Sequence, residues 1–311
     1  MNIVVVGAGP AGMSCALWLK NFGYRPIVLD RADAPGGIQK DNFHNNPWVL
    51  GFEEGSGADI MQQLVRHFSG LGIDTVTGAD IEHVTKHSNG FLLRAQSAGK
   101  HVALESRCIV VATGTQPRLP HTLADAARAS ARVLVGPLAT EIRDHIAGKS
   151  VLVLGGGDNA LENSLHLARR DNRITICARG GVRGRKFFLD HCLAHPNIQV
   201  LQGCELNSLT DDGARVLAQT GQGQTYYDYV LVMFGFQPNS AWLEAIDPAI
   251  RPRLNSAGFI DVDLWQRSSV AGIYAAGDIT NLQHPCVATA IAQGAVAAKA
   301  IDEFLEMAGA D

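Results

Sequence analysis

The sequence predicts an α/β fold of two domains, and three observations support this prediction. At 311 residues the chain is long for one compact core and has room for two. A unit of apolar strand, glycine-rich turn, helix and second strand occurs twice, over residues 3–30 and 150–179. Each unit is followed by alternating polar and apolar residues with turn residues, near 80–103 and 197–232, which predicts a β-meander. Strands and helices in alternation are typical of α/β domains.

The first unit begins with an apolar strand, residues 3–6, that runs directly into the motif Gly7-Ala8-Gly9-Pro10-Ala11-Gly12. In such a motif Gly7 permits a tight turn, Gly9 lets the backbone approach a pyrophosphate, and Gly12 lets the helix pack on the strand. The helix N-terminus offers N–H groups and a positive dipole to phosphates. The next strand ends at Asp30, where a carboxylate accepts ribose hydroxyls. Together these features predict a Rossmann-like dinucleotide site rather than an ordinary turn.

The second unit repeats this pattern with two changes. Its strand enters Gly155-Gly156-Gly157-Asp158-Asn159-Ala160, so Ala160 replaces the third glycine. Its second strand ends at Arg179 instead of an acid, and Arg183 and Arg185 follow. A carboxylate there would repel a 2′-phosphate whereas arginines pair with one, which favours NADP(H) over NAD(H). The alternative is that these are solvated arginines of a flexible loop, because three glycines, Gly180, Gly181 and Gly184, lie among them.

The ends of the two units predict how the domains are connected. Apolar strands at 108–112 and 229–234 each run into a glycine, and proline-bearing segments at 116–120 and 237–239 follow, which predicts hinges there. The tail adds one more strand, Gly277-Asp278 and an alanine-rich helix. We therefore expect the second domain to be inserted in the first. The predicted boundaries are 1–115 with 245–311 for the first domain, and 116–244 for the second.

Composition narrows the class of protein. The formal net charge is −4 and no basic run extends beyond residues 183–186, which argues against a nucleic-acid partner. No run approaches the roughly 20 apolar residues that span a bilayer, so no membrane partner is expected. The first strand starts directly after Met1 and leaves no room for a signal peptide, which predicts a cytoplasmic protein. The six cysteines are scattered, which excludes a CxxC motif and a close-spaced zinc set and predicts buried thiols and no metal site.

The motifs, in their order and spacing, resemble the low-molecular-weight thioredoxin reductases and their relatives among flavoproteins with two dinucleotide-binding domains. The resemblance covers nearly the whole chain. It implies FAD in the first domain, a nicotinamide dinucleotide in the inserted domain, and a homodimer. The residues that carry it are Gly7 to Gly12, Pro35-Gly36-Gly37, Ala112-Thr113-Gly114, Gly155 to Ala160, Gly235-Phe236-Gln237-Pro238-Asn239 and Ala275-Ala276-Gly277-Asp278.

The resemblance also implies which residues bind each cofactor. Gly36 and Gly37 would lie beside the ribityl chain and flavin, Asp278 would bond the ribityl or pyrophosphate portion, and the helix after His284-Pro285 would direct its positive end at the flavin pyrimidine edge. The residues expected at FAD are Gly7, Gly9, Pro10, Ala11, Gly12, Asp30, Gly36, Gly37, Thr113, Gly114, Gly277, Asp278, Cys286 and Val287. Those expected at NADP are Gly155, Gly157, Asp158, Asn159, Ala160, Arg179, Arg183 and Arg185.

One departure from the resemblance bears directly on function. Thioredoxin reductases carry a redox-active CxxC shortly before the second glycine motif, where this chain reads Val133 to Glu141 without any cysteine. Thiol–disulfide exchange needs a nucleophilic thiolate and a resolving thiol close together. Disulfide reduction through this position is therefore excluded.

Catalytic residues are left open, because hydride transfer to a flavin needs no side-chain acid or base. Cys286 is one candidate, since the resemblance places it at a helix N-terminus near the flavin, where a thiol pKa is lowered; the alternative is a small packing residue. His44 is the other, as part of the segment 44–48 that follows Gly37. The alternative there is a polar loop whose Trp48 shields the ring.

The sequence thus predicts an FAD-dependent NAD(P)H oxidoreductase, in which a hydride passes from nicotinamide to flavin and electrons leave to a non-disulfide acceptor. The acceptor is a small molecule or an electron carrier. Ferredoxin and flavodoxin are candidates, because family members without the CxxC act as ferredoxin-NADP reductases. Two alternatives stay open. The chain is a flavin-binding redox sensor or partner protein with little turnover, or a flavoprotein that ferredoxin reduces instead of NADPH.

Overall fold

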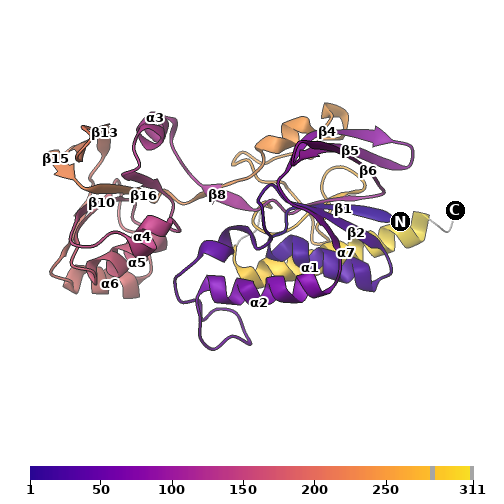
Figure 1. Cartoon of the computed structure of the whole chain (residues 1–311), viewed down its shortest axis with the longest axis horizontal. Helices are drawn as coiled ribbons and strands as arrows, with labels where there is room; N and C mark the ends of the chain where they lie inside the picture. Colours follow the sequence, from indigo (N-terminus) through magenta and orange to yellow (C-terminus); the bar gives the residue numbers. More distant parts are fainter. Residues whose placement is uncertain (281–283, 309–311) are drawn as a thin grey trace. The chain divides into compact units, whose positions relative to one another are not determined.

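The computed structural model describes residues 1–280 and 284–308 and divides into two compact units (Figure 1). The first unit contains Met1–Gln116 and Gln237–Asp311, and the second contains Pro117–Phe236. The chain passes between them in two short strands, β8 (Thr115–Pro117) and β17 (Phe236–Pro238), which pair with each other. The second unit is thus inserted in the first.

The chain returns from the second unit to the first after Phe236, which is earlier than the expected boundary at residue 244. Residues 237–244 belong to the first unit because their bonds and packing lie there. The Asn239 N–H donates to the Gly114 carbonyl at 3.0 Å. Leu243 is buried against Val84 and Ile246 in the core of that unit. These contacts join residues far apart in sequence, so local composition did not reveal them.

The first unit is built on a five-stranded sheet in the order β18-β7-β1-β2-β3, all of it parallel. Successive strand residues point to opposite faces. Val5 and Val110 lie in the core with α1 and α7, whereas Val4 and Val111 lie in the core with the meander. Both faces of the sheet are covered, which explains why the sequences of these strands are continuously apolar. The elements are β1 (Asn2–Val6), α1 (Pro10–Asn21), β2 (Arg25–Leu29), α2 (Gly57–Gly70), β3 (Asp74–Val76), β7 (Ile109–Val111), β18 (Ile273–Ala275) and α7 (Val287–Ala308).

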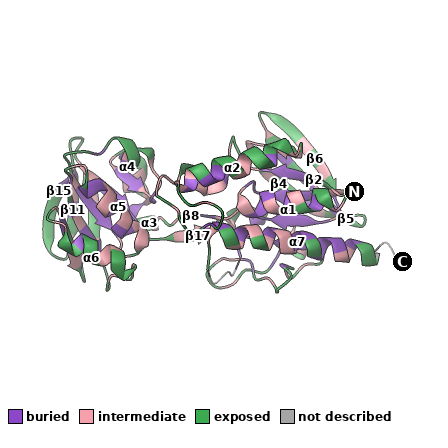
Figure 2. Cartoon of the chain, turned by 90° about the horizontal axis from the view of Figure 1, so that it is seen from below, coloured by how far each residue is buried: buried purple, intermediate pink, exposed green. Residues whose placement is uncertain are grey.

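An antiparallel meander covers the other face of this sheet, as predicted (Figure 1). It consists of β4 (Ala79–His87), β5 (Gly90–Ser97) and β6 (Lys100–Ser106). The first two turns of α1 are buried or half-buried, and its exposed residues, Trp18, Lys20 and Asn21, lie at its end (Figure 2). Short 3₁₀ turns complete the unit at Gly37–Asp41, Ala241–Ala245 and Pro248–Ile250.

The second unit repeats the architecture with a five-stranded parallel sheet in the order β12-β11-β10-β16-β9. Its sheet strands are β9 (Val133–Val135), β10 (Ser150–Leu154), β11 (Arg173–Ala178), β12 (Ile198–Gln202) and β16 (Tyr229–Val232). Its helices are α3 (His121–Ala129), α4 (Thr140–Asp144), α5 (Asp158–Ala168) and α6 (Lys186–Ala194). The meander is formed by β13 (Leu206–Asp211), β14 (Val216–Thr220) and β15 (Gly223–Tyr227).

One strand differs from the sequence prediction. Residues 198–202 were expected in the meander, but β12 pairs parallel with β11 at the edge of the main sheet. The reason is its place after α6, since a strand that follows a crossover helix returns to the same sheet in parallel. The predicted fold class, two Rossmann-like domains each with a β-meander, is otherwise confirmed.

All six cysteines are free, and five of them are buried while Cys286 is half-buried. Burial raises the pKa of Cys108 to about 12 and that of Cys192 to about 11, so these thiols stay protonated. This confirms the predicted buried thiols. Within residues 1–280 and 284–308, no group of His, Cys, Asp and Glu is arranged to hold a metal ion. In the same residues, no helix combines the length and apolarity needed to cross a bilayer.

Candidate functional site

The first glycine motif connects β1 to α1, and its three glycines differ in what they allow. Gly7 has φ +109°, and a Cβ there would collide with the Ala112 carbonyl. A Cβ on Gly12 would overlap the Gly7 carbonyl. Gly9 has an ordinary φ of −76°. Apart from its chain neighbours, the nearest heavy atom to a Cβ built on Gly9 would be the Gly37 Cα, at 4.0 Å. The fold itself therefore requires Gly7 and Gly12, while Gly9 borders open space.

Helix α1 begins at this motif without a side-chain cap. Gly9 is the N-cap, Pro10 occupies the first turn, and no side-chain hydrogen bond caps the helix within the described chain. The first N–H groups of a helix have no intrahelical partner and carry a partial positive charge. An uncapped helix N-terminus beside open space is suited to a phosphate group.

Asp30 lies at the end of β2 and bonds to backbone on both sides. Its Oδ2 accepts the N–H of Ala8 at 2.6 Å, and its Oδ1 accepts the N–H of Ala32 at 2.7 Å. Since a carboxylate has about four acceptor positions, Asp30 can hold the glycine turn and still accept ribose hydroxyls. The sequence predicted only the second role.

The segment Gly36-Gly37 lies directly against the glycine turn. The Gly36 N–H donates to the Ala8 carbonyl at 2.9 Å, and a Cβ on Gly37 would lie 3.3 Å from the Gly9 Cα. Both glycines have positive φ, +123° and +59°, which other residues rarely adopt. Gly36 and Gly37 therefore lie close to the first glycine turn.

Gly277 approaches the same turn from the tail of the chain. It has φ +80°, and a Cβ there would lie 2.8 Å from the Ala11 Cβ. Its N–H donates to the Gln293 Oε1 at 2.7 Å. On α7, Gly294 lies so close to the Ala11 carbonyl that it has no room for a side chain. Gln293 and Gly294 were not among the residues predicted from the sequence; the run of small residues around Gly294 was the available signal.

Asp278 follows with an unusual feature for a carboxylate. Its Oδ1 is buried and has no hydrogen-bond partner within residues 1–280 and 284–308. Burial raises the pKa of Asp278 because the charged form is poorly solvated. Buried polar atoms are nearly always hydrogen-bonded, so this oxygen fits a donor from outside the described residues, such as a hydroxyl of a bound nucleotide.

Thr113 and Gly114 follow β7 and contact the returning chain. The Thr113 Oγ1 donates to the Asn239 carbonyl at 3.0 Å, and the Asn239 Nδ2 donates to the Thr113 carbonyl at 2.9 Å. Gly114 has φ +62° and, at its Cβ position, no heavy atom within 4 Å beyond its chain neighbours. Thr113 therefore holds residue 239 in place, and Gly114 borders open space.

Cys286 lies just before the first residue of α7. The Thr289 N–H points to the Cys286 Sγ at 3.5 Å, and the Cys286 N–H donates to the Thr289 Oγ1 at 3.1 Å. This reciprocal pair is a capping box with sulfur in the place of the usual oxygen. The next residue, Val287, is buried against Val49 and Ile60.

The segment that contains His44 precedes α2. His44 is half-buried, its ring lies 4.2 Å from that of Phe43, and its carbonyl accepts the Gly57 N–H at 3.1 Å. Trp48 is 68% exposed, and the residue that packs against Val287 is Val49. The contact between this segment and the start of α7 is therefore apolar.

The second glycine motif, between β10 and α5, is built like the first. Gly155 has φ +139°, and a Cβ there would collide with the Met233 carbonyl. Gly157 is the N-cap of α5, which no side chain caps within the described residues, and a Cβ at Gly157 would meet no heavy atom within 4 Å beyond its chain neighbours. Ala160 is fully buried, so the third position accepts a methyl group. The Asn159 carbonyl accepts the Asn163 Nδ2 at 2.8 Å.

The three arginines after β11 differ in their surroundings. All three are exposed. Arg185 pairs with Asp158, its Nε lying 2.9 Å from the Asp158 Oδ2. Arg185 is thus bound to the motif itself, and Arg179 and Arg183 lie in the loop that leads to it.

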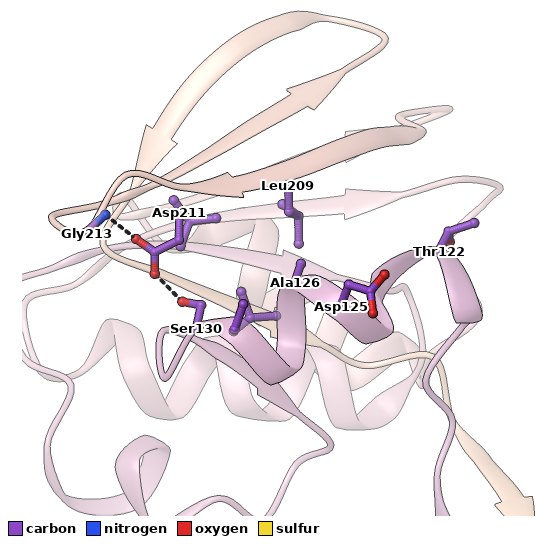
Figure 3. Close-up of a pocket in the computed structure, with 10 residues that line it drawn as sticks. Thr122, Asp125, Ala126, Ser130, Leu209, Asp211 and Gly213 are labelled. Atoms are coloured by element: carbon purple, nitrogen blue, oxygen red, sulfur yellow. Dashed lines mark hydrogen bonds between the residues drawn. The ribbon is translucent and has the colours of Figure 1, made fainter.

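A further hollow of about 510 Å³ lies in the second unit between α3 and the β13–β14 hairpin (Figure 3). Asp211 there accepts the Ser130 hydroxyl and the Gly213 N–H, and both bonds lower its pKa. Asp125 is paired with Arg128. None of these lining residues belongs to a glycine motif, so this hollow is separate from both motifs.

Comparisons with known proteins agree with this geometry. A profile of the pyridine nucleotide-disulphide oxidoreductase family matches residues 1–295. The chain belongs to this family. The thioredoxin reductase of Helicobacter pylori is 27% identical over 98% of this chain and 99% of its own length.

Solved structures of the same kind share the fold. The thioredoxin reductases of Lactococcus lactis and T. acidophilum each have a TM-score of 0.83 at 22% identity. The first covers 98% of this chain and 99% of its own length, and the second 97% of each. The predicted resemblance to thioredoxin reductases is confirmed, and family membership implies FAD and NAD(P)H as cofactors.

Proposed function

We propose that this chain is an FAD-dependent NAD(P)H oxidoreductase that passes electrons to a non-disulfide acceptor. The observation that carries the proposal is the duplicated glycine turn. In each copy one glycine is required by close backbone contact, Gly7 or Gly155, while another borders open space at an uncapped helix N-terminus, Gly9 or Gly157. Two such turns in one chain fit two dinucleotides.

In the first unit the residues fit FAD. The turn at Gly9 and the start of α1 would receive the pyrophosphate, and Asp30 would accept ribose hydroxyls. Asp278 would accept a hydroxyl through its Oδ1, which has no partner among the described residues. When bound, FAD supplies the transfer of electrons from a reduced nicotinamide to the acceptor. The chain's own residues bind and orient it.

In the second unit the residues fit a nicotinamide dinucleotide. The N–H groups at the start of α5 would receive its pyrophosphate. Arg179 and Arg183 are exposed cations in the position where a 2′-phosphate would lie, and no acid ends β11. Arginine pairs with phosphate through two parallel bonds, so we infer a preference for NADP(H) over NAD(H).

The cysteines support the choice of acceptor. No cysteine lies in Val133 to Glu141, where the thioredoxin reductases that the chain resembles carry their redox pair. Five cysteines are buried, and only Cys286 is half-buried. A single accessible thiol has no resolving partner for disulfide exchange. The acceptor is then a small molecule or an electron carrier, with ferredoxin and flavodoxin as candidates, and the resemblance suggests a homodimer.

Anaerobic titration of the purified holoprotein with NADPH and NADH tests this function. We expect NADPH to bleach the flavin absorbance at lower concentration than NADH. The reduced protein is then mixed with oxygen, quinones, ferredoxin, flavodoxin and oxidised thioredoxin, and all but thioredoxin are candidates for rapid reoxidation.

The alternatives give different results in the same experiment. A colourless protein that refuses FAD would overturn the proposal. A yellow protein indifferent to both coenzymes would support a redox sensor or partner protein, and bleaching by reduced ferredoxin alone would support a ferredoxin-reduced flavoprotein. Rapid oxidation by thioredoxin would overturn the choice of acceptor only.

A further inference from the structure

After β11 the chain returns across the second glycine turn, over residues 179–185. The N–H groups of Arg183 and Gly184 both donate to the Gly156 carbonyl, at 2.8 and 3.0 Å. A Cβ on Gly184 would lie 3.1 Å from the Gly157 carbonyl carbon and 2.5 Å from the Leu161 side chain. The loop backbone thus lies directly on the turn, with no room for a side chain at Gly184.

One carboxylate holds the end of this loop by two bonds. The Asp158 Oδ1 accepts the backbone N–H of Arg185 at 2.6 Å, and the Asp158 Oδ2 accepts its Nε at 2.9 Å. The Arg185 guanidinium also lies 4.7 Å from the centre of the Phe188 ring. Asp158 is the first residue of α5, so the pair joins the loop to the helix that begins at the glycine turn.

A second acid places Arg185 in a negative environment. Glu162 lies one turn further along α5 and is half-buried; burial raises its pKa, and Arg185 acts in the opposite direction. Arg185 is itself exposed, and its guanidinium balances acidic groups on α5. Sequence analysis had grouped it with Arg179 and Arg183 as a phosphate ligand.

The loop has a composition that makes this attachment important. Gly180, Gly181 and Gly184 give it a large conformational freedom, and ordering such a segment upon binding lowers affinity. A loop already ordered in the free protein avoids that loss. Arg179 and Arg183, which we propose bind a 2′-phosphate, lie within this loop, and the Asp158 bonds to Arg185 add to the two backbone bonds on Gly156.

We propose that the Asp158–Arg185 pair is the positioning element that holds residues 179–185 on the glycine turn and so sets the preference of this site for the phosphorylated coenzyme. This inference rests on the proposed function, because it assigns a role to the pair in that same site. Asp158 and Arg185 are positioning residues, since they act through Arg179 and Arg183. A dinucleotide without the 2′-phosphate does not use these two arginines, so the pair affects it less.

The test compares NADPH and NADH affinities of the FAD-loaded protein. Asp158→Ala removes both bonds, Asp158→Asn keeps the acceptor for the Arg185 N–H, and Arg185→Ala keeps that N–H but removes the ion pair. Removing the Asp158 charge also favours the pyrophosphate, but this effect is common to both coenzymes and cancels in the ratio of their dissociation constants. We expect Asp158→Ala to lower the preference for NADPH about tenfold, and the other two variants to lower it less.

Two variants serve as controls. Asp190→Ala breaks the neighbouring exposed pair with Lys186 on α6, whose Nζ and Oδ2 atoms lie 2.7 Å apart, and should leave the ratio unchanged. Arg179→Ala removes a proposed phosphate ligand directly. It should lower the preference for NADPH while the loop stays in place. The FAD content of every variant should equal that of the wild type, because the changes lie in the other unit.

Limited trypsin digestion without nucleotide gives a second measurement that does not depend on coenzyme binding. We expect cleavage after Arg183 to be several-fold faster in Asp158→Ala than in the wild type or in Asp190→Ala. An unchanged ratio together with unchanged cleavage in Asp158→Ala would overturn the role of the pair and leave the proposed function intact. A wild type that binds neither coenzyme would overturn the proposed function, whatever the cleavage rate shows of the loop.

Discussion

The Asp30 carboxylate and the Ala8 backbone are joined by a hydrogen bond of 2.6 Å, so the acid that ends β2 holds the glycine turn that follows β1. Its other oxygen accepts the Ala32 N–H at 2.7 Å. Under the proposed function the same side chain also accepts ribose hydroxyls. A residue with both tasks links the stability of the turn to the affinity for the nucleotide.

Replacement of Asp30 should therefore affect both properties. In Asp30→Ala the N–H groups of Ala8 and Ala32 lose a charged acceptor, and we expect the apoprotein to lose about 1–3 kcal/mol in the free energy of unfolding. We also expect a lower ratio of flavin to protein absorbance after purification. Urea unfolding of the apoprotein measures the first effect. Asp33→Ala, which removes an exposed acid of the same segment, is the control, and equal behaviour of the two variants would contradict the prediction.

Substitutions of two glycines in the first motif should affect different properties, Gly7 the stability of the fold and Gly9 the binding of FAD. Gly7→Ala forces a methyl group into the Ala112 carbonyl at a positive φ, so we expect loss of soluble folded protein or a destabilisation of several kcal/mol. Gly9→Ala has an ordinary φ and open space, so the apoprotein should be as stable as the wild type. Its methyl group, however, lies where the pyrophosphate would approach.

Circular dichroism and FAD titration distinguish these outcomes. Gly9→Ala is expected to keep the wild-type spectrum and melting temperature of the apoprotein and to bind FAD at least about tenfold more weakly, because a displaced pyrophosphate loses its backbone bonds. Tight FAD binding by this variant would show that the nucleotide does not use this turn. Gly157→Ala is the matching change in the second unit. It should leave FAD binding unchanged and weaken NADPH binding.

The parts of the fold and site that were predictable from sequence are those encoded locally. Each glycine motif, its preceding strand and its helix lie within one short segment, and the structure has them as predicted. What was missed depends on contacts between distant residues. The Asp158–Arg185 pair joins a helix start to a loop beyond the next strand, and the bonds of Asn239 to Thr113 join the two segments of the first unit that flank the inserted one. Spacing alone carries no information on such pairs.

Substitutions of Cys286 distinguish a role of its thiol in capping α7 from a role in catalysis. Because its Sγ accepts the Thr289 N–H at 3.5 Å, Cys286→Ser should keep the cap, while Cys286→Ala should destabilise the protein by about 0.5–2 kcal/mol. We expect the serine variant to reoxidise its flavin at the wild-type rate in stopped-flow mixing with the preferred acceptor. A large fall in that rate with unchanged stability would instead make Cys286 a catalytic residue.

Asp278 should give the protein a pH dependence that FAD reverses. Its pKa in the folded apoprotein is raised by burial, so the folded chain holds its proton to higher pH than the unfolded chain. The contribution of the protonated Asp278 to the free energy of unfolding is therefore complete below the ordinary aspartate pKa. It is lost as pH rises through the raised pKa of the folded protein. Asp278→Asn removes this loss, and we expect the variant apoprotein to be more stable than the wild type near pH 7, with the difference vanishing in acid.

With FAD bound the order of stability should be inverted. The unpartnered Oδ1 then receives a hydroxyl, and the charged form becomes the favoured one. Asp278→Asn should therefore retain FAD less well at neutral pH although its apoprotein is the more stable. Thermal unfolding of both proteins, with and without FAD across the acid to neutral range, measures the two effects together. If the variant were less stable than the wild type in the absence of FAD at every pH, the buried oxygen would have a partner within the chain, and its assignment to the nucleotide would fail.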